Sequence, residues 1–398
     1  MNKNILYISY DGLTDQLGQS QILPYIIALS ELGYNFTIIS AEKPEIYDKE
    51  KKIISKICKE NNIDWKPVKY TKKPPILSTI KDIKNIRKLA YKLHKQKKFY
   101  AVHCRSYIPA IIGLKMQQKY GVKFIFDMRG FWADERIDGK IWDLNKHHYR
   151  LVYKYFKKKE TQFCDNADAI VSLTHIGKKI MQEEWKVKKP IYVIPCAVDT
   201  NLFKLDNKEN LQSQIQKSEF TLGYLGSIGT WYMLDEMLDF FKVLLEKYPK
   251  AKFKFITKED PAIILNKAIA RDINLEKFDI SLAQRNDVPT ELSKIDIGIF
   301  FIKPTYSKQS SSPVKQGEYM AMGIPVIANS GIGDTDNIIN NYNSGILVKE
   351  FTYEEYRRVV DLIPERIKEN KVSILKGADE YFSLKKGANT YSQLYKKL

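Results

Sequence analysis

Short runs of apolar residues alternate along this chain with longer stretches in which apolar residues recur every three to four positions. The short runs, rich in Ile, Val and Phe, are typical of strands buried on both faces of a parallel sheet. The longer stretches have the spacing of amphipathic helices. This alternation predicts an α/β fold with parallel sheets.

The alternation occurs twice. In the first half, strands are predicted over residues 5–9, 36–40, 100–103, 123–126, 169–173 and 191–194, with helices over 19–32, 76–94, 108–120 and 148–163. In the second half, strands are predicted over residues 220–225, 253–257, 278–281, 295–301, 325–328 and 345–348, with helices between them. The polar stretch 206–219 is interpreted as a domain linker. We therefore expect two Rossmann-like domains facing a central cleft, with ligands at the carboxyl ends of the strands.

Length and composition agree with two soluble domains. A chain of 398 residues, 44% hydrophobic, can bury two ordinary cores. It contains no apolar run near the roughly 18 residues that a spanning helix needs, and its first residues are too short for a signal peptide. We expect a cytoplasmic protein. The four cysteines are scattered and no His-Glu-x-x-His pattern occurs, which disfavours a disulfide framework, a zinc site and a zinc hydrolase.

The most informative stretch is 311–328, SSPVKQGEYMAMGIPVIA. Pro313 can open a helix, because the first turn leaves its missing N–H unpaired anyway. Lys315 and Glu318 then share one helix face. The first-turn N–H groups and the Lys315 ammonium suit a diphosphate, and Glu318 can accept two ribose hydroxyls. Taken alone, the Lys–Glu spacing favours a solvated ion pair.

Two flanking features change that interpretation: a Ser-Pro precedes this pair, and a Gly-Ile-Pro ends the helix. Together they resemble the donor-binding motif of family 4 glycosyltransferases of the GT-B fold, in the form S-P-x-K-x-x-E-Y-x-A-x-G-x-P-V-I. The family transfers a sugar from a nucleotide diphosphate donor with retention at the anomeric carbon. The resemblance implies domains over residues 1–205 (acceptor side) and 206–377 (nucleotide sugar), and a terminal helix over 378–398 that crosses back to the first domain.

Residues 11–21, DGLTDQLGQSQ, follow the first predicted strand. Gly12 and Gly18 allow close backbone approach, and the helix that follows would present N–H groups to a ligand. As a bare glycine loop, this could equally be a plain strand-to-helix connection. The sequence pattern D-G-x-T-D-x-L-G-Q-S-Q resembles the N-terminal segment of a bacterial family 4 subgroup, which favours a functional loop.

Charged residues also follow two later strands, in the stretches 103–107 (HCRSY) and 126–136 (FDMRGFWADER). A structural ion pair between Asp127 and Arg129 is one interpretation. The same subgroup carries H-x-R-S-Y and F-D-M-R-G-x-W-x-x-E at these points. By resemblance, Asp127 and Arg129 contact the transferred sugar or the acceptor.

The resemblance assigns three groups of site residues. Catalysis is assigned to Asp127, Arg129 and Lys315. Donor binding is assigned to Gly18, Gln19, Gly226, Ser227, Arg285, Ser312, Lys315 and Glu318. Contact with the acceptor or the sugar is assigned to Asp11, Arg105 and Glu135.

The chain also departs from the family pattern. No His stands at Arg105 or Arg129, where many members use one, and Ser310 replaces the first acid of an E-x7-E pair. The Arg and Lys usual after the first strand of the second domain are missing, so neutralisation of the diphosphate falls mainly on Lys315, with Arg285 as a second cation. Asp334-Thr335-Asp336 reads D-x-D but is interpreted as a helix cap, so we predict no metal and no cofactor.

The formal charge of +18 indicates an anionic partner. Twelve Lys or Arg residues and one acid lie between residues 66 and 98, and a basic aromatic stretch spans 149–159. A solvated helix face is one interpretation. The aromatic residues favour an anionic membrane surface, and no nucleic-acid-binding motif accompanies the charge.

These observations predict a retaining, metal-independent glycosyltransferase. The expected partners are a nucleotide sugar donor, a saccharide or lipid-linked saccharide acceptor, and the inner face of the plasma membrane; no nucleic acid is expected. Surface polysaccharide assembly is the expected setting. Two alternatives stay open: a nucleotide-sugar epimerase or hydrolase on the same fold, and a non-catalytic basic adaptor for membrane or nucleic acid.

Overall fold

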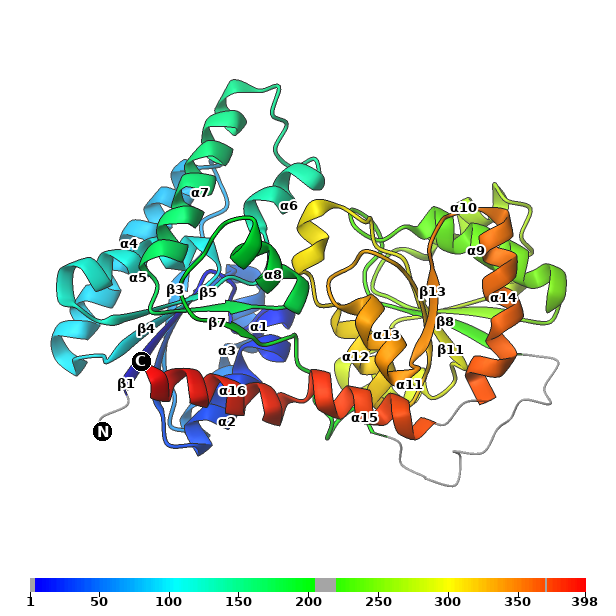
Figure 1. The fold of residues 1–398 in the computed structure, drawn as a ribbon. Helices are drawn as coiled ribbons and strands as arrows, with labels where there is room; N and C mark the ends of the chain where they lie inside the picture. Colours follow the sequence, from blue (N-terminus) through cyan, green and yellow to red (C-terminus); the bar gives the residue numbers. More distant parts are fainter. Residues whose placement is uncertain (1–3, 205–219, 369–370) are drawn as a thin grey trace. The chain divides into compact units, whose positions relative to one another are not determined.

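The computed structural model describes residues 4–204, 220–368 and 371–398, which form two compact units (Figure 1). Unit 1 comprises residues 1–195 and 384–398, and unit 2 comprises 196–383. The predicted boundaries at 205 and 377 thus differ from these divisions, because Cys196 and Val198 bond to other residues of unit 2. Their N–H groups donate to Ser312 Oγ and to the Phe382 carbonyl oxygen. The predicted linker 206–219 lies outside the described residues.

The described part of unit 1 contains one parallel sheet in the order β3-β2-β1-β4-β5-β6-β7. Its strands are β1 (Asn4–Ser9), β2 (Asn35–Glu42), β3 (Asp64–Lys69), β4 (Ala101–Arg105), β5 (Lys123–Asp127), β6 (Ala169–Ser172) and β7 (Ile191–Val193). The order reverses direction between β1 and β4. In doubly wound folds, ligands bind beside the strand ends at such a switch point.

Helices cover both faces of this sheet (Figure 1). They are α1 (Gln16–Gln21), α2 (Leu23–Glu31), α3 (Pro44–Glu60), α4 (Leu77–Lys97), α5 (Tyr107–Tyr120), α6 (Trp132–Asp138), α7 (His147–Asn166), α8 (His175–Glu183) and the C-terminal α16 (Leu384–Lys397). On one face α5 packs between α4 and α7, and on the other α2 packs against α16. The C-terminal helix therefore belongs to the core of unit 1.

Unit 1 differs from the sequence-based expectations in several elements. The helix predicted over 19–32 is two helices, because Pro24 supplies no N–H to continue α1 and instead stands in the first turn of α2. The elements α3, α6, α8 and β3 were not predicted. Strand β3 lies at the sheet edge, is half-buried, and contains Pro67, so it lacks the apolar run of an interior strand.

The described part of unit 2 contains a second parallel sheet, in the order β10-β9-β8-β11-β12-β13. Its strands are β8 (Thr221–Leu225), β9 (Lys252–Ile256), β10 (Phe278–Ser281), β11 (Ile297–Phe300), β12 (Val326–Asn329) and β13 (Gly345–Val348). Its helices are α9 (Leu234–Lys247), α10 (Pro261–Ile269), α11 (Val288–Leu292), α12 (Val314–Ala321), α13 (Thr335–Tyr342), α14 (Tyr353–Lys368) and α15 (Lys371–Phe382). All six predicted strands of this half are confirmed, which confirms two parallel-sheet α/β domains.

The predicted terminal helix is divided between the units. Helix α15 ends at Phe382 in unit 2, and α16 begins at Leu384 in unit 1. Between them, Ser383 forms a bridge with Val198. Each unit has its own apolar core, one centred on β8, β11 and α9 and the other on β4, β5 and α5.

Candidate active site

Helix α12 places Lys315 at the end of a buried strand of unit 2. The helix begins at Val314, with Pro313 as the extended N-cap residue rather than the first helical residue. It ends before Gly323, whose φ of 66° is the left-handed conformation typical of a glycine stop. The predicted helix and its stop signal are confirmed to within one residue.

Tyr319 fixes α12 against the sheet. Its ring lies so close to Gly298 of β11 that an added Cβ would approach ring carbons to 2.8 Å. Its hydroxyl donates to the carbonyl oxygen of Gly223 in β8, at 2.9 Å. Because the ring is fully buried, these contacts set how far α12 stands from β8. They place Lys315, one turn earlier, over the carboxyl end of β8.

The ammonium group of Lys315 is enclosed by aromatic rings. Nζ lies 4.2 Å from the ring centroid of Tyr224 and 3.6 Å from that of Tyr232, and it donates to the Tyr224 hydroxyl at 3.0 Å. A Cβ at Gly226, where φ is 121°, would lie 3.1 Å from Nζ. Glycine at this position thus keeps the space beside the ammonium group open.

Lys315 differs from Lys254, another buried lysine of unit 2, in its lack of a carboxylate at ion-pair distance among the described residues. Lys254 lies 2.7 Å from both Asp279 and Glu291, and Lys157 pairs with Asp134 and Glu160. Among the residues that the structure describes, no carboxylate lies within 4.0 Å of Lys315 Nζ. Burial therefore lowers the pKa of Lys315 well below its ordinary value. An anionic ligand would supply the missing counter-charge.

Glu318 and Arg285 lie on the same side of unit 2. Both Lys315 and Glu318 are buried, which excludes the solvated ion pair that the bare spacing allowed. Burial raises the pKa of Glu318. The positive charge of Arg285 opposes this rise, since Arg285 Nη1 lies 3.7 Å from Glu318 Oε1. Ser312 is half-buried and accepts the Cys196 N–H, and Ser227 is exposed after Gly226. The structure thus brings most of the predicted donor-binding residues of unit 2 together.

In unit 1, charged side chains meet at the ends of β1, β4 and β5. Arg105 Nε lies 3.6 Å from Asp11 Oδ2, and Arg129 Nη1 lies 3.8 Å from Asp127 Oδ1. Asp11 is partly exposed, whereas Asp127 is fully buried. Burial alone would raise the pKa of Asp127, but the charges of Arg129 and Arg105 and the hydrogen bond from His103 outweigh it and hold the pKa below its ordinary value.

The loop after β1 is held by a buried carboxylate, Glu42 at the end of β2. Its oxygens accept the N–H groups of Leu13 (2.8 Å) and Thr14 (3.2 Å), as well as the Thr14 hydroxyl. These N–H groups are therefore occupied. The sequence-based expectation concerned the N–H groups of the helix that follows, and it stays a prediction. A Cβ on Gly18 would overlap the Gly12 carbonyl oxygen, and Gln19 donates to the Thr14 carbonyl oxygen at 3.0 Å.

Two further residues discussed from the sequence stand at the starts of α6 and α13. Glu135 stands half-buried in the first turn of α6. Asp334 is the N-cap residue of α13, yet its carboxylate accepts the Tyr381 hydroxyl and does not cap the helix. In the described ranges, no group of three or more His, Cys, Asp or Glu side chains could hold a metal ion. Within the same ranges, no helix has the length and apolar character to cross a bilayer.

Three features of the site were missed from the sequence. His103 was read only as part of a motif, yet its ring is buried against Asp127. Tyr391 donates to Asp127 from the C-terminal helix, at 3.0 Å. Glu42 gave no signal beyond being a charged residue at the end of an apolar run. The one signal in the sequence that could have identified Glu42 is its position as an isolated acidic residue after a buried strand.

Family models match both halves of the chain. Residues 25–202 match the model described as Glycosyltransferase Family 4, and residues 206–373 match Glycosyl transferases group 1. A comparison with curated protein sequences gives no significant match. The two parallel-sheet units and these matches define a glycosyltransferase of the GT-B fold. More particularly, the chain carries a family 4 domain followed by a group 1 domain.

Solved structures share this fold at low sequence identity. Sucrose-phosphate synthase from Thermosynechococcus elongatus has 13% identity and a TM-score of 0.73, with 99% of this chain and 98% of that chain covered. Anabaena HepE in complex with UDP and glucose has 10% identity and a TM-score of 0.67, with both chains fully covered. WaaG, a glycosyltransferase involved in lipopolysaccharide biosynthesis, has 12% identity, a TM-score of 0.66, and 97% and 98% coverage.

Proposed function

We propose that this glycosyltransferase moves a sugar from a nucleotide diphosphate donor to a saccharide or lipid-linked saccharide, with retention at the anomeric carbon and without a metal. The observation that carries this proposal is the buried ammonium of Lys315, with no carboxylate of the described residues within 4.0 Å of Nζ, beside the open space at Gly226. Breaking the anomeric C–O bond builds negative charge on the departing diphosphate. A preorganised cation in a site that excludes water stabilises that charge strongly.

Other groups of each unit complete the substrate contacts in this proposal. Glu318 accepts hydroxyls of the ribose, and Arg285 serves as a second cation near the phosphates. Arg129 and Arg105 contact the transferred sugar or the acceptor from unit 1. The likeness to HepE, whose structure holds UDP and glucose, supports a nucleotide sugar as the donor.

A donor screen with the purified full chain tests this proposal. We expect one nucleotide sugar, with UDP-glucose the first to try, to release its nucleoside diphosphate and to glycosylate a saccharide acceptor. Product analysis with the donor alone separates transfer from the epimerase or hydrolase alternative. If calorimetry detects no nucleoside diphosphate binding and no donor turns over, the proposed function is wrong.

We further propose that unit 1 docks on an anionic membrane surface, where a lipid-linked acceptor would be presented. Helix α7 exposes Leu151 and Tyr155, 54% and 47% accessible, beside the exposed Lys154 and Lys158. Helix α4, which packs on the same central helix α5, likewise exposes Leu77 among lysines. Apolar side chains flanked by cations suit the headgroup region of a bilayer.

Charge reversal on α7 is expected to weaken this docking. Each cation near an anionic surface contributes about 1 kcal/mol, so Lys154→Glu with Lys158→Glu should lower binding to vesicles containing phosphatidylserine at least about tenfold. Flotation of vesicles measures the effect. Lys242→Glu with Lys250→Glu, an equal charge change at exposed positions of unit 2, is the control. Equal flotation of all three proteins would contradict the docking surface.

A further inference from the structure

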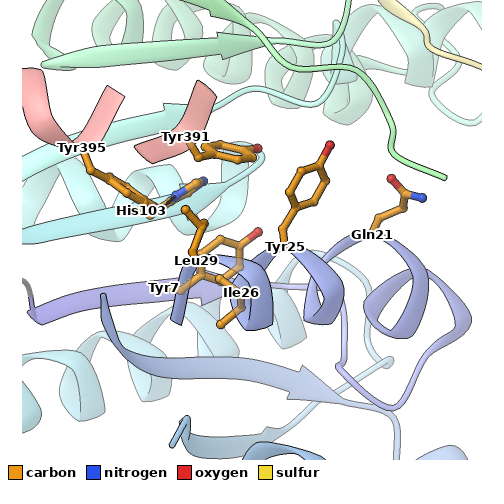
Figure 2. A pocket seen from close by; sticks show the side chains of 8 residues that line it. All are labelled: Tyr7, Gln21, Tyr25, Ile26, Leu29, His103, Tyr391 and Tyr395. Atoms are coloured by element: carbon orange, nitrogen blue, oxygen red, sulfur yellow. Dashed lines mark hydrogen bonds between the residues drawn. The ribbon is translucent and has the colours of Figure 1, made fainter. Parts of the chain in front are cut away.

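The C-terminal helix places Tyr391 and Tyr395 beside His103 (Figure 2). Their hydroxyls bond to Asp127 and His103 in the buried charge cluster of unit 1. Tyr391 donates to Asp127 Oδ2 at 3.0 Å, and the Tyr395 hydroxyl lies 2.7 Å from His103 Nδ1. His103 Nε2 in turn lies 3.2 Å from Asp127 Oδ2. A continuous hydrogen-bonded network thus connects α16 to the ends of β4 and β5, with partners 264 and 292 residues apart in sequence.

The protonation states within this network follow from burial. Burial lowers the pKa of His103, so the imidazole is neutral near pH 7 and carries one ring proton. Because Asp127 is ionised, that proton belongs on Nε2, which donates to the carboxylate. Nδ1 then accepts the hydroxyl proton of Tyr395. The three donors between α16 and Asp127, which are the Tyr391 and Tyr395 hydroxyls and the His103 Nε2–H, thus each have an acceptor, and such pairing favours a rigid arrangement of a buried polar network.

The network ends at Arg129. The other oxygen of Asp127, Oδ1, lies 3.8 Å from Arg129 Nη1. Arg129 has a φ of 56°, a left-handed conformation that is unfavourable for a residue with a side chain, and Gly130 follows with a φ of 109°. Such a conformation persists only where the surroundings determine it. The carboxylate of Asp127 is an ion-pair partner of Arg129 and, without a direct hydrogen bond, favours a guanidinium orientation that keeps Nη1 near Oδ1.

A substrate is not expected to bind within the network itself. The cavity beside it has a volume of about 10 Å³ and is lined by eight residues, including Tyr7, Tyr25, His103 and Tyr391 (Figure 2). That volume accommodates about one water molecule and no sugar ring. Asp127 is fully buried as well. The tyrosines and Asp127 therefore act on a substrate only through the side chain that they hold.

We propose that Tyr391 and Tyr395 are positioning residues for glycosyl transfer, which fix Asp127 and thereby the guanidinium of Arg129 that faces the substrate. This inference rests on the proposed function. It makes the C-terminal helix part of the catalytic apparatus of unit 1, in addition to its packing role. Asp127 was assigned to catalysis by resemblance. In this proposal it is a positioning residue that orients Arg129.

The test compares Tyr391→Phe and Tyr395→Phe with Tyr34→Phe. Tyr34 also binds α16, through the Ser392 carbonyl oxygen at 3.1 Å, but takes no part in the hydrogen-bonded network to Asp127. All three variants remove one hydroxyl from the same interface and keep the ring. We expect Tyr391→Phe to lower kcat about tenfold or more, the range for a hydrogen bond to a charged group, with the donor KM changed less than about twofold. Tyr34→Phe should leave both constants at wild-type values.

The outcomes separate the inference from the function on which it rests. A selective loss of kcat in Tyr391→Phe and Tyr395→Phe, at melting temperatures equal to that of Tyr34→Phe, supports positioning. Wild-type kcat in both network variants, or equal losses in all three proteins, would overturn the inference while leaving the transferase intact. A wild-type protein that turns over no nucleotide sugar would instead overturn the proposed function.

Discussion

Replacing Lys315 with methionine is expected to lower kcat about a hundredfold, because it removes the cation that meets the charge developing on the departing diphosphate. Methionine has nearly the length and volume of the lysine stem, so packing between Tyr224 and Tyr232 is kept. The melting temperature should stay the same or rise, because a buried ammonium with no described carboxylate at ion-pair distance is costly to the folded state. Steady-state kinetics at saturating donor and thermal unfolding measure the two effects.

The same substitution should remove a pH dependence. Because burial lowers the pKa of Lys315, its ammonium loses its proton at a lower pH than an exposed lysine does. Only the protonated form attracts a diphosphate. In the wild type, affinity for the nucleoside diphosphate should therefore fall as pH rises through that lowered pKa. In Lys315→Met this component of the pH dependence should be absent, as calorimetric titrations across pH can determine.

Lys254→Met is the matched control for both measurements. Lys254 is buried in the same unit but pairs with two carboxylates, Asp279 and Glu291. Its replacement leaves those acids without their cation, so it should lower the melting temperature and leave kcat of the folded protein unchanged. A loss of turnover in Lys254→Met as large as that in Lys315→Met would show that the effect is structural and would contradict the phosphate role.

The sequence predicted those parts of the fold that are encoded locally. Buried strands such as β5 and β12 are visible as apolar runs, and α12 is bounded by Pro313 and Gly323. Strand β3 could not be found in this way, because it has no apolar run. A strand at the sheet edge does not require one and tolerates a proline. Its place is fixed by pairing with β2, which is a tertiary interaction.

The candidate site likewise contains residues that local sequence patterns identify and residues that only tertiary contacts identify. Lys315 and Glu318 were found because helical spacing places both on one face, a local property. The sequence also placed Asp127 correctly at the end of a strand. It could not show that Asp127 is buried, since the groups that cover it include Tyr391 on a helix at the other end of the chain. Nor could spacing reveal that Glu42 binds the loop after β1, because the two come together only through pairing of β1 with β2.

Replacing Asp127 with asparagine is expected to destabilise unit 1 by about 3–5 kcal/mol, because it leaves the buried guanidinium groups of Arg105 and Arg129 without their central counter-charge. The variant should also alter the pH dependence of stability. The folded-state pKa of Asp127 is lower than that of an unfolded aspartate, about 3.9, so its contribution is fully present above that pH. The contribution is lost as pH falls toward and through the lowered folded-state pKa.

The free energy difference between wild type and Asp127→Asn should therefore be largest near neutral pH and shrink below about pH 4. Hydrogen exchange of the β5 amides reports this difference for unit 1 alone, without requiring the two units to unfold together. Asp82→Asn is the control, since Asp82 is equally buried but accepts from the Tyr10 hydroxyl and the Thr71 N–H rather than from arginines. If the β5 amides of the Asp127→Asn variant exchange at wild-type rates near neutral pH, or if the difference is independent of pH, Asp127 does not compensate the two arginines. The network from Tyr391 to Arg129 would then lack the charge on which its orienting effect depends.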